Sequence, residues 1–304
     1  MAGDHPGCRL AQRTPLNAPT GVFFGLAAAV SWGVADFFIA VFSRRIGPFR
    51  TIVAMMIGAA VAFTGLFLAL RPRISISPAD WGVLAALSVL VLVNYLSFYK
   101  ALELGPLAIV TPVVTAYAAI VIVASVVLLD ERLDPIQATA ISVTIGGVVL
   151  ASADLRRLQP GAARIGRGVW FGLFSMMGFG ITVFVGGLYA RKYGWFLPAY
   201  LVRVFVALLL TAIAAGRREW PWQRLGAGTL AFVFVMGALE SGGFFWFARG
   251  AELGFISIVA AASAVYPIIP LVLGLALFRE RPAPNQMAGI LAVIAGVFVL
   301  GLQS

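Results

Sequence analysis

Two acidic residues lie inside long apolar segments, where charged groups are uncommon. Asp36 is the sixteenth residue of the apolar segment 21–42, and Glu240 lies within the segment 229–248. A charged side chain at the centre of a membrane costs about 2.5–3.5 kcal/mol on insertion scales, so such groups usually face a cavity or a partner. Asp36 and Glu240 are therefore candidates for binding a substrate or exchanging a proton. The alternative is a neutral or ion-paired carboxylate that only fixes helix packing.

A basic residue lies at a depth similar to that of one of these acids. Arg203 follows the start of the apolar segment 197–215, and Glu240 precedes the end of the segment 229–248. At 1.5 Å per helical residue, both side chains would lie roughly 9–12 Å from the same membrane face. An ion pair between them is possible and would give Glu240 a structural role. Because the segment that contains Asp36 has no basic residue, we predict Asp36 as the proton-linked or amine-binding acid.

Two tyrosines occupy equivalent central positions in apolar segments. Tyr117 lies in the segment 107–129, and Tyr266 lies in the segment 256–278. A buried tyrosine hydroxyl needs a hydrogen-bond partner, which a cavity water or a substrate would provide. Other aromatic residues near the centres of the segments could complete an aromatic pocket: Trp32, Tyr95, Phe98, Phe179, Phe244 and Trp246. For any one of these rings, plain packing is the alternative.

The composition indicates that membrane helices position these residues. Hydrophobic residues make up 61% of the chain and charged residues 11%, whereas soluble domains are roughly 45–50% apolar and about 25% charged. Apolar segments of about 20 residues are long enough to cross the hydrocarbon core as helices. We therefore expect an all-α membrane protein with ten spans. The predicted spans are 21–42, 50–70, 81–100, 107–129, 136–153, 168–189, 197–215, 229–248, 256–278 and 285–302.

The chain contains two copies of one unit. Residues 101–152 align with residues 250–301 without a gap, so that Tyr117 corresponds to Tyr266. A second match relates the first apolar segment to the sixth. The predicted organisation is a polar tail (1–20), a first repeat (21–153), a linker (154–167) and a second repeat (168–302). Because five spans is an odd number, the second copy would cross the membrane in the opposite direction. Many secondary transporters have such inverted repeats, with the binding site between the halves.

Several function classes are disfavoured by what the sequence contains. The basic residues occur mainly in pairs between the apolar segments, a pattern typical of lipid headgroup contacts rather than nucleic-acid binding. The one histidine, His5, lies in the polar tail, so we expect no histidine-based metal site or serine–histidine relay in the membrane. No glycine-rich phosphate loop is present. We expect neither a cofactor nor a metal. An enzyme or passive pore that uses Asp36 and Glu240 stays the alternative to a transporter.

Several short motifs, in this order and in both halves, resemble the EamA-domain branch of the drug/metabolite transporter superfamily. The motifs are Trp32-Gly33, Ala101-Leu102 followed by Gly105-Pro106, the turns Asp130-Glu131-Arg132 and Arg279-Glu280-Arg281, and the closing stretches 146–150 and 296–300. Two positions depart from the family pattern. Asp36 lies where the family often has asparagine or serine. The family also has a proline in the fourth span of each repeat; the second half has Pro267 at this position, and the first half has Ala118.

The resemblance implies a ten-helix carrier or exporter of small metabolites in a bacterial cytoplasmic membrane. The expected pocket is aromatic and weakly polar, which suits amino acids, amphiphilic metabolites or drugs. We expect a small-molecule substrate, protons as a candidate coupling ion, and a monomer or homodimer in the lipid bilayer. The resemblance also implies cytoplasmic termini. The distribution of arginine and lysine between the predicted loops favours the opposite orientation, since basic residues concentrate on the cytoplasmic side.

Overall fold

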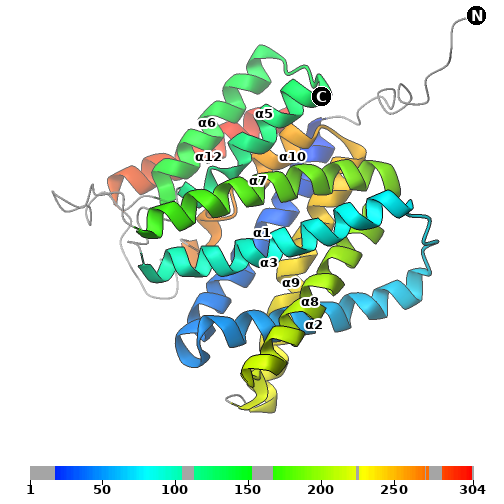
Figure 1. Cartoon of the computed structure of the whole chain (residues 1–304). Helices are drawn as coiled ribbons and strands as arrows, with labels where there is room; N and C mark the ends of the chain where they lie inside the picture. Colours follow the sequence, from blue (N-terminus) through cyan, green and yellow to red (C-terminus); the bar gives the residue numbers. More distant parts are fainter. Residues whose placement is uncertain are drawn as a thin grey trace, which may run out of the picture.

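The described part of the chain is helical throughout. The computed structural model describes residues 18–104, 113–152, 167–223, 226–270, 272–273 and 283–302, and within these ranges it has no strand. The helices are α1 (Ala18–Ile46), α2 (Pro48–Leu70), α3 (Pro78–Leu104), α5 (Tyr117–Leu129), α6 (Pro135–Ser152), α7 (Arg167–Tyr193), α8 (Leu197–Arg217), η3 (Pro221–Gln223), α9 (Ala227–Leu253), α10 (Ile256–Ser263) and α12 (Pro284–Leu302). The predicted all-α class is confirmed (Figure 1). The polar tail and the linker lie almost wholly outside the described residues.

Among the described residues, six helices are long and apolar enough to cross a membrane: α1, α2, α3, α7, α8 and α9. Apolar helical residues also lie in each of the other four predicted spans, of which residues 107–112, 153, 271 and 274–278 are outside the described residues. The apolar helical stretches there are shorter: Val113–Leu129, Pro135–Ala151, Ile256–Pro270 and Pro284–Leu300. Among the described residues, each repeat therefore has three long apolar helices followed by two shorter apolar stretches.

The ninth predicted span is interrupted near its middle. Helix α10 ends at Ser263, and the chain turns before helical residues resume at Ile268. The backbone amides of Tyr266 and Ile268 donate to carbonyls three residues earlier, at 3.1 and 3.0 Å, instead of continuing the α-helical ladder. Pro267 has no amide hydrogen to donate, which explains the break at this position. In the fourth predicted span, Pro112 lies outside the described residues.

Equivalent positions of the two repeats have the same local conformation. Helix α2 ends at Arg71 and helix α8 ends at Arg218, both with left-handed backbone (φ 45° and 54°). These residues correspond to each other at the sequence offset of 147 that also relates the first and sixth apolar segments. A left-handed residue that returns its amide to the last helical turn is a common way to end a helix. The duplication is therefore visible in the backbone as well as in the sequence.

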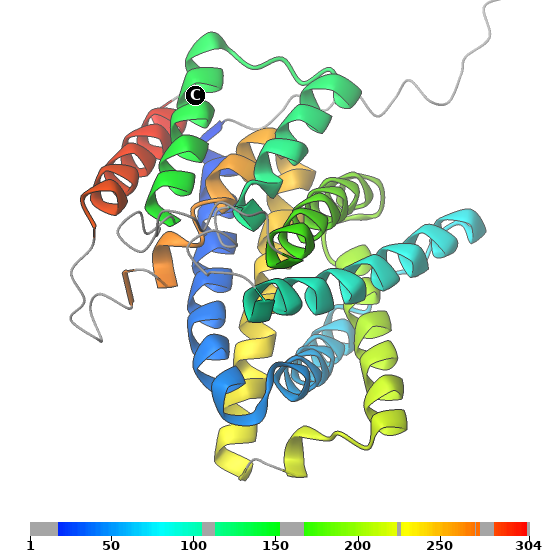
Figure 2. The same ribbon diagram turned by 60° about the vertical axis from the view of Figure 1, so that its left-hand side comes forward.

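The helix packing also follows the duplication. Helix α1 packs along α9, and its equivalent α7 packs along α3, the equivalent of α9. Helices α2 and α6 each pack against their own equivalents, α8 and α12, and α5 of the fourth predicted span packs against α10 of the ninth. In both views the α1–α9 and α3–α7 pairs lie side by side, with α6 and α12 together at one end of the molecule (Figures 1 and 2). Exchanging the two halves thus preserves the main helix contacts.

Small residues allow the closest of these contacts. A Cβ atom at Gly237 of α9 would collide with the backbone carbonyl of Met55 in α2, so that only glycine fits at this crossing. Gly25 and Gly33 on α1 likewise face residues 259–269 of the second repeat. Small residues at spacings of four or eight allow two helix backbones to approach closely. The stripe of small residues along α1 therefore packs the two repeats together.

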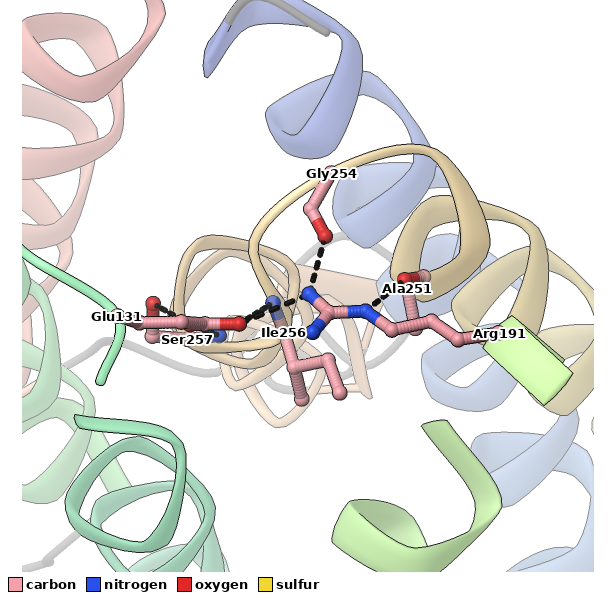
Figure 3. A network of polar contacts seen from close by, with 6 residues as sticks. All are labelled: Glu131, Arg191, Ala251, Gly254, Ile256 and Ser257. Atoms are coloured by element: carbon pink, nitrogen blue, oxygen red, sulfur yellow. Dashed lines mark hydrogen bonds and ion pairs between the residues drawn. The ribbon is translucent and has the colours of Figure 1, made fainter. Parts of the chain in front are cut away.

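A buried carboxylate joins the repeats at one end of the helices (Figure 3). Glu131, 5% exposed, follows α5 and receives hydrogen bonds from the backbone amides of Ile256 (3.0 Å) and Ser257 (3.2 Å) and from the Ser257 hydroxyl (2.7 Å). A negative charge at a helix N-terminus is favourable, here at the start of α10. Arg191 of α7 forms an ion pair with the same carboxylate (2.8 Å) and donates to the carbonyls of Ala251 and Gly254. We call these contacts the Glu131 network.

A second polar cluster joins α3 to the same end of α7. Asp80, 8% exposed, accepts hydrogen bonds from the hydroxyls of Tyr189 (2.6 Å) and Tyr193 and from the Lys192 ammonium group (2.6 Å). Ser77 donates to the same carboxylate at 2.6 Å. These contacts, the Asp80 network, again connect the first repeat to the second. Both networks involve the last turn of α7, so polar contacts connect the two repeats at this end of the helix bundle.

Candidate functional site

A central cavity lies where helices of both repeats meet. It contains about 600 Å³ of space not filled by atoms, part of it open to the surroundings. The lining residues are Trp32 and Asp36 of α1, Met55 of α2, Tyr95, Phe98 and Tyr99 of α3, Val114 and Tyr117 at the start of α5, Phe179 and Val183 of α7, Glu240 and Phe244 of α9, and Tyr266 after α10. The structure therefore brings together six of the eight predicted site residues: Trp32, Asp36, Tyr95, Tyr117, Glu240 and Tyr266.

The lining follows the duplication in position. Four pairs of equivalent residues all face the cavity: Trp32 with Phe179, Asp36 with Val183, Tyr95 with Phe244, and Tyr117 with Tyr266. The two repeats thus contribute the same helix faces, but they contribute different chemical groups. Each acid comes from one half alone, since Asp36 corresponds to Val183 and Glu240 corresponds to Val91.

Asp36 is the less engaged of the two acids. Its side chain is partly buried, and none of the hydrogen bonds or ion pairs found among the described residues involves it. Glu240 and the hydroxyl groups of Tyr99, Tyr117 and Tyr266 are close enough to interact with it electrostatically. A carboxylate that faces an apolar cavity without a partner is costly, so it takes up a proton or a cation.

Glu240 is held in a buried polar network. Its carboxylate accepts hydrogen bonds from the Tyr95 hydroxyl and from the Ser241 hydroxyl (3.1 Å). Arg203 donates to the Tyr95 hydroxyl at 3.3 Å, so that Tyr95 connects the guanidinium group to the acid. Arg203 and Glu240 are 2% and 4% exposed. The ion pair considered from the sequence is therefore bridged by a tyrosine: the two residues lie at similar depth, but the Tyr95 side chain comes between them.

The guanidinium group of Arg203 faces a second cavity. It lies 3.7 Å from the centre of the Phe244 ring, which is a close cation–π contact. Arg203 is absent from the lining of the central cavity but lines the adjoining one, between α3, α7, α8 and α9. Val183 and Phe244 line both cavities and form the partition between them. Other residues of the adjoining cavity are mainly apolar: Leu84, Leu87, Val91, Val202, Phe247 and Ala248 among them.

Aromatic rings form a continuous wall on one side of the central cavity. The Trp32 indole is 6% exposed and packs edge-on against Phe244 (4.8 Å between ring centres) and Tyr266 (6.1 Å).

Tyr117 is 5% exposed, and its hydroxyl forms no hydrogen bond with regular geometry among the described residues, although the Ser263 hydroxyl lies nearby. A buried hydroxyl that lines a cavity in this way is available to a bound molecule.

Two predicted site residues lie outside the central cavity. Trp246 is 44% exposed and contacts Phe24 at 6.0 Å on the outer surface of α9, so its predicted place in the pocket is wrong. The reason is helical geometry, because a residue two positions after Phe244 points to the opposite face. The second is Arg203, which lines the adjoining cavity. The residues that the sequence prediction missed include Tyr99, which lies one turn after Tyr95 and could have been found from that spacing.

No metal-binding cluster is formed by the described residues, since nowhere among them do three histidine, cysteine, aspartate or glutamate side chains converge. The central cavity instead offers two carboxyl groups, tyrosine hydroxyls and aromatic faces. Such a cavity binds molecules by charge, hydrogen bonds and ring contacts.

Comparison with known proteins agrees with this architecture. The solved structure of a protein titled only "Crystal structure of protein" superimposes with a TM-score of 0.75 at 16% sequence identity, covering 93% of this chain and 96% of that one. At this identity the likeness shows a shared fold. No curated protein matches the sequence. The model of the EamA-like transporter family matches twice, at residues 19–153 and 166–302, which together span nearly the whole chain. The chain belongs to the EamA-like transporter family, a multi-pass membrane family of the drug/metabolite transporter superfamily.

Proposed function

We propose that the protein is a secondary transporter that exports small organic molecules by alternating access at the central cavity. The observation that carries the proposal is the placement of Asp36, a carboxyl group without a hydrogen-bond partner among the described residues, in a cavity lined by both repeats. Family membership supports transport as the general activity. Binding sites between two repeats are typical of secondary transporters, because moving one repeat against the other exposes the site to each side in turn.

The mechanism that we propose requires the two repeats to cross the membrane in opposite directions. The odd number of apolar segments in each repeat and the exchange of helix contacts between halves support this inverted arrangement. In that arrangement, the ends of α5, α7 and α9 lie at one membrane face, together with the starts of α3 and α10. The Glu131 and Asp80 networks would then close the central cavity on that face, and opening would require both networks to separate.

The two acids have different roles in this proposal. Asp36 binds a proton or the cationic group of the substrate, and it exchanges one for the other as the cavity opens to either side. Glu240, engaged by Tyr95 and Ser241, positions the helices α3, α8 and α9 through the bridge to Arg203. We further propose that the protein works in a bacterial cytoplasmic membrane with both termini in the cytoplasm.

A resistance screen followed by reconstitution tests the function. Cells that express the protein are challenged with toxic amino-acid analogues, aromatic amines and cationic dyes, and we expect resistance to at least one class. The protective compound is then used for counterflow in proteoliposomes, which a carrier gives and a passive pore or an enzyme does not. If no class distinguishes these cells from cells with an empty vector, the proposal fails.

The same assays test the division of roles between the acids. Asp36→Asn should abolish resistance and gradient-driven transport while the amount of folded protein stays normal, because only the exchangeable group is lost. Glu240→Gln should mainly lower the unfolding temperature, because its network is buried. Glu252→Gln is the matched control, since this carboxylate pairs with Arg249 near the end of α9, away from the cavity. Gradient-driven transport by Asp36→Asn at the wild-type rate would contradict the assigned role.

A further inference from the structure

The charges that face the central cavity are unbalanced. Among the described residues, its lining contains the carboxyl groups of Asp36 and Glu240 and no lysine, arginine or histidine. The one buried cation of the described part of the chain is Arg203, but its guanidinium group packs on the Phe244 ring and lines the adjoining cavity. In the described lining, a molecule in the central cavity therefore meets two acids and no basic group.

Only one of these acids is unmatched. Glu240 accepts hydrogen bonds from Tyr95 and Ser241, and Arg203 lies behind Tyr95 to balance its charge. Asp36 has no comparable partner among the described residues. The cavity thus presents a single negative charge that a proton or a bound cation neutralises, because an isolated carboxylate in an apolar site is unfavourable.

The groups around Asp36 suit a cation rather than an anion. Trp32, one helical turn from Asp36, packs with Phe244 and Tyr266 and offers the aromatic surface that attracts positively charged nitrogen. Tyr117 is 5% exposed, and its buried hydroxyl, without a regular hydrogen bond among the described residues, has oxygen lone pairs available to an ammonium group. This unpaired hydroxyl is independent of the acids and points to a polar ligand group at the same site.

We propose that the central cavity selects monovalent organic cations, aromatic or apolar bodies that carry one ammonium group, over the amino acids with the same side chain. This inference rests on the proposed transport function and names the substrate class of that site. The ammonium group pairs with Asp36 and the aromatic body packs against the rings. An amino acid would bring its carboxylate into a cavity whose described lining has Glu240 and no basic group. The cost of burying that unpaired charge excludes it.

Direct binding to the purified protein tests the selectivity. Tritiated tryptamine is the probe, and the competitors are N,N,N-trimethyltryptammonium, L-tryptophan and indole-3-propionate, which share the indole ring and differ in charge. We expect both cations to displace the probe, tryptophan to bind at least about tenfold more weakly and the propionate not to compete, since an unmatched buried charge costs more than one tenfold step in affinity. Tryptophan binding as tightly as tryptamine would overturn the proposal, as would binding of the propionate.

Two variants connect the selectivity to the named residues. Asp36→Asn should weaken tryptamine binding by at least about tenfold, whereas Glu252→Gln, which removes a carboxylate outside the cavity, should leave it unchanged. Tyr117→Phe should weaken tryptamine but not the trimethyl compound, because a quaternary ammonium has no hydrogen to donate to the hydroxyl. If folded Asp36→Asn binds tryptamine as tightly as the wild type does, the proposed role of Asp36 in this site is wrong.

These experiments can refute the transport function and the substrate class independently of each other. If resistance and counterflow are found for amino acids and not for amines, the transport function stands and the substrate class is wrong. If tryptamine binds through Asp36 but no compound of the screen gives counterflow, the cation site stands and the transport function is wrong.

Discussion

Replacing Glu131 by glutamine should measurably weaken the connection between the two repeats. The carboxylate uses both oxygens: one accepts from Arg191 and the Ile256 amide, and the other accepts from the amide and hydroxyl of Ser257. Glutamine keeps one carbonyl oxygen and replaces the other by an NH2 group. If that group faces Ser257, the hydroxyl can rotate to accept a hydrogen bond, but the Ser257 amide is left without an acceptor.

The magnitude follows from the burial of this site. The Glu131 side chain is 3% exposed, so the lost interactions are not replaced by water. Loss of a hydrogen bond that involves a charged group costs about 1.5–3 kcal/mol. One kilocalorie per mole shifts the unfolding temperature of a large domain by about 2–4 °C. We therefore expect Glu131→Gln to lower the unfolding temperature by roughly 3–12 °C.

Tryptophan fluorescence during heating of the detergent-solubilised protein at pH 7 measures this shift. The control is Glu252→Gln, which makes the same chemical change in a more exposed pair with Arg249 (2.7 Å) three residues away on α9. Exposed pairs of this kind contribute about 0–1 kcal/mol, so the control should shift by at most about 4 °C and by less than Glu131→Gln. Equal unfolding temperatures for the two variants would refute the view that the Glu131 network holds the repeats together.

Three further predictions concern packing, the cavity and topology. Gly237→Ala should destabilise the protein by about 1–3 kcal/mol, since its methyl group meets backbone of α2 that cannot move aside, and chemical denaturation measures it. Tyr117→Phe and Tyr266→Phe should each reduce transport of the compound found in the screen without lowering the unfolding temperature; normal transport by both would make them packing residues. With Cys8 replaced, the exposed positions Ser75→Cys and Gly216→Cys should react with an impermeant maleimide from opposite membrane faces, and reaction from one face would end the inverted arrangement.

The sequence was sufficient to predict the helical class, the duplication and the family because each depends on a signal repeated along the whole chain. It was insufficient for the backbone of the ninth predicted span. Hydropathy measures the composition of the segment 256–278, which is apolar throughout, and composition is the same for a continuous and an interrupted helix. The break near Pro267 depends on where hydrogen bonds are lost, and a proline alone does not say whether a helix bends or ends.

In the candidate site, the sequence predicted the depth of the side chains in the membrane but not the direction in which they point. Counting residues from helix ends placed Arg203 and Glu240 at similar depth, but depth does not specify which way each side chain points. The Tyr95 hydroxyl occupies the space between them, and the guanidinium group turns onto Phe244 instead. The prediction for Trp246 was wrong for a different reason, because the direction of its side chain follows from helical periodicity alone. Its two-residue separation from Phe244 already places it on the outer face of α9.

Duplication and divergence therefore determine different properties of the cavity. The duplication determines which positions face it, because equivalent residues such as Tyr117 and Tyr266 both line it. Divergence determines its charge: if residue 183 were an aspartate like Asp36, two unmatched carboxylates would face the same cavity. Like charges so placed repel each other, and one would be protonated or require a divalent ligand. A single acid opposite a valine needs only one positive charge, and this asymmetry is why we expect a monovalent cation to bind.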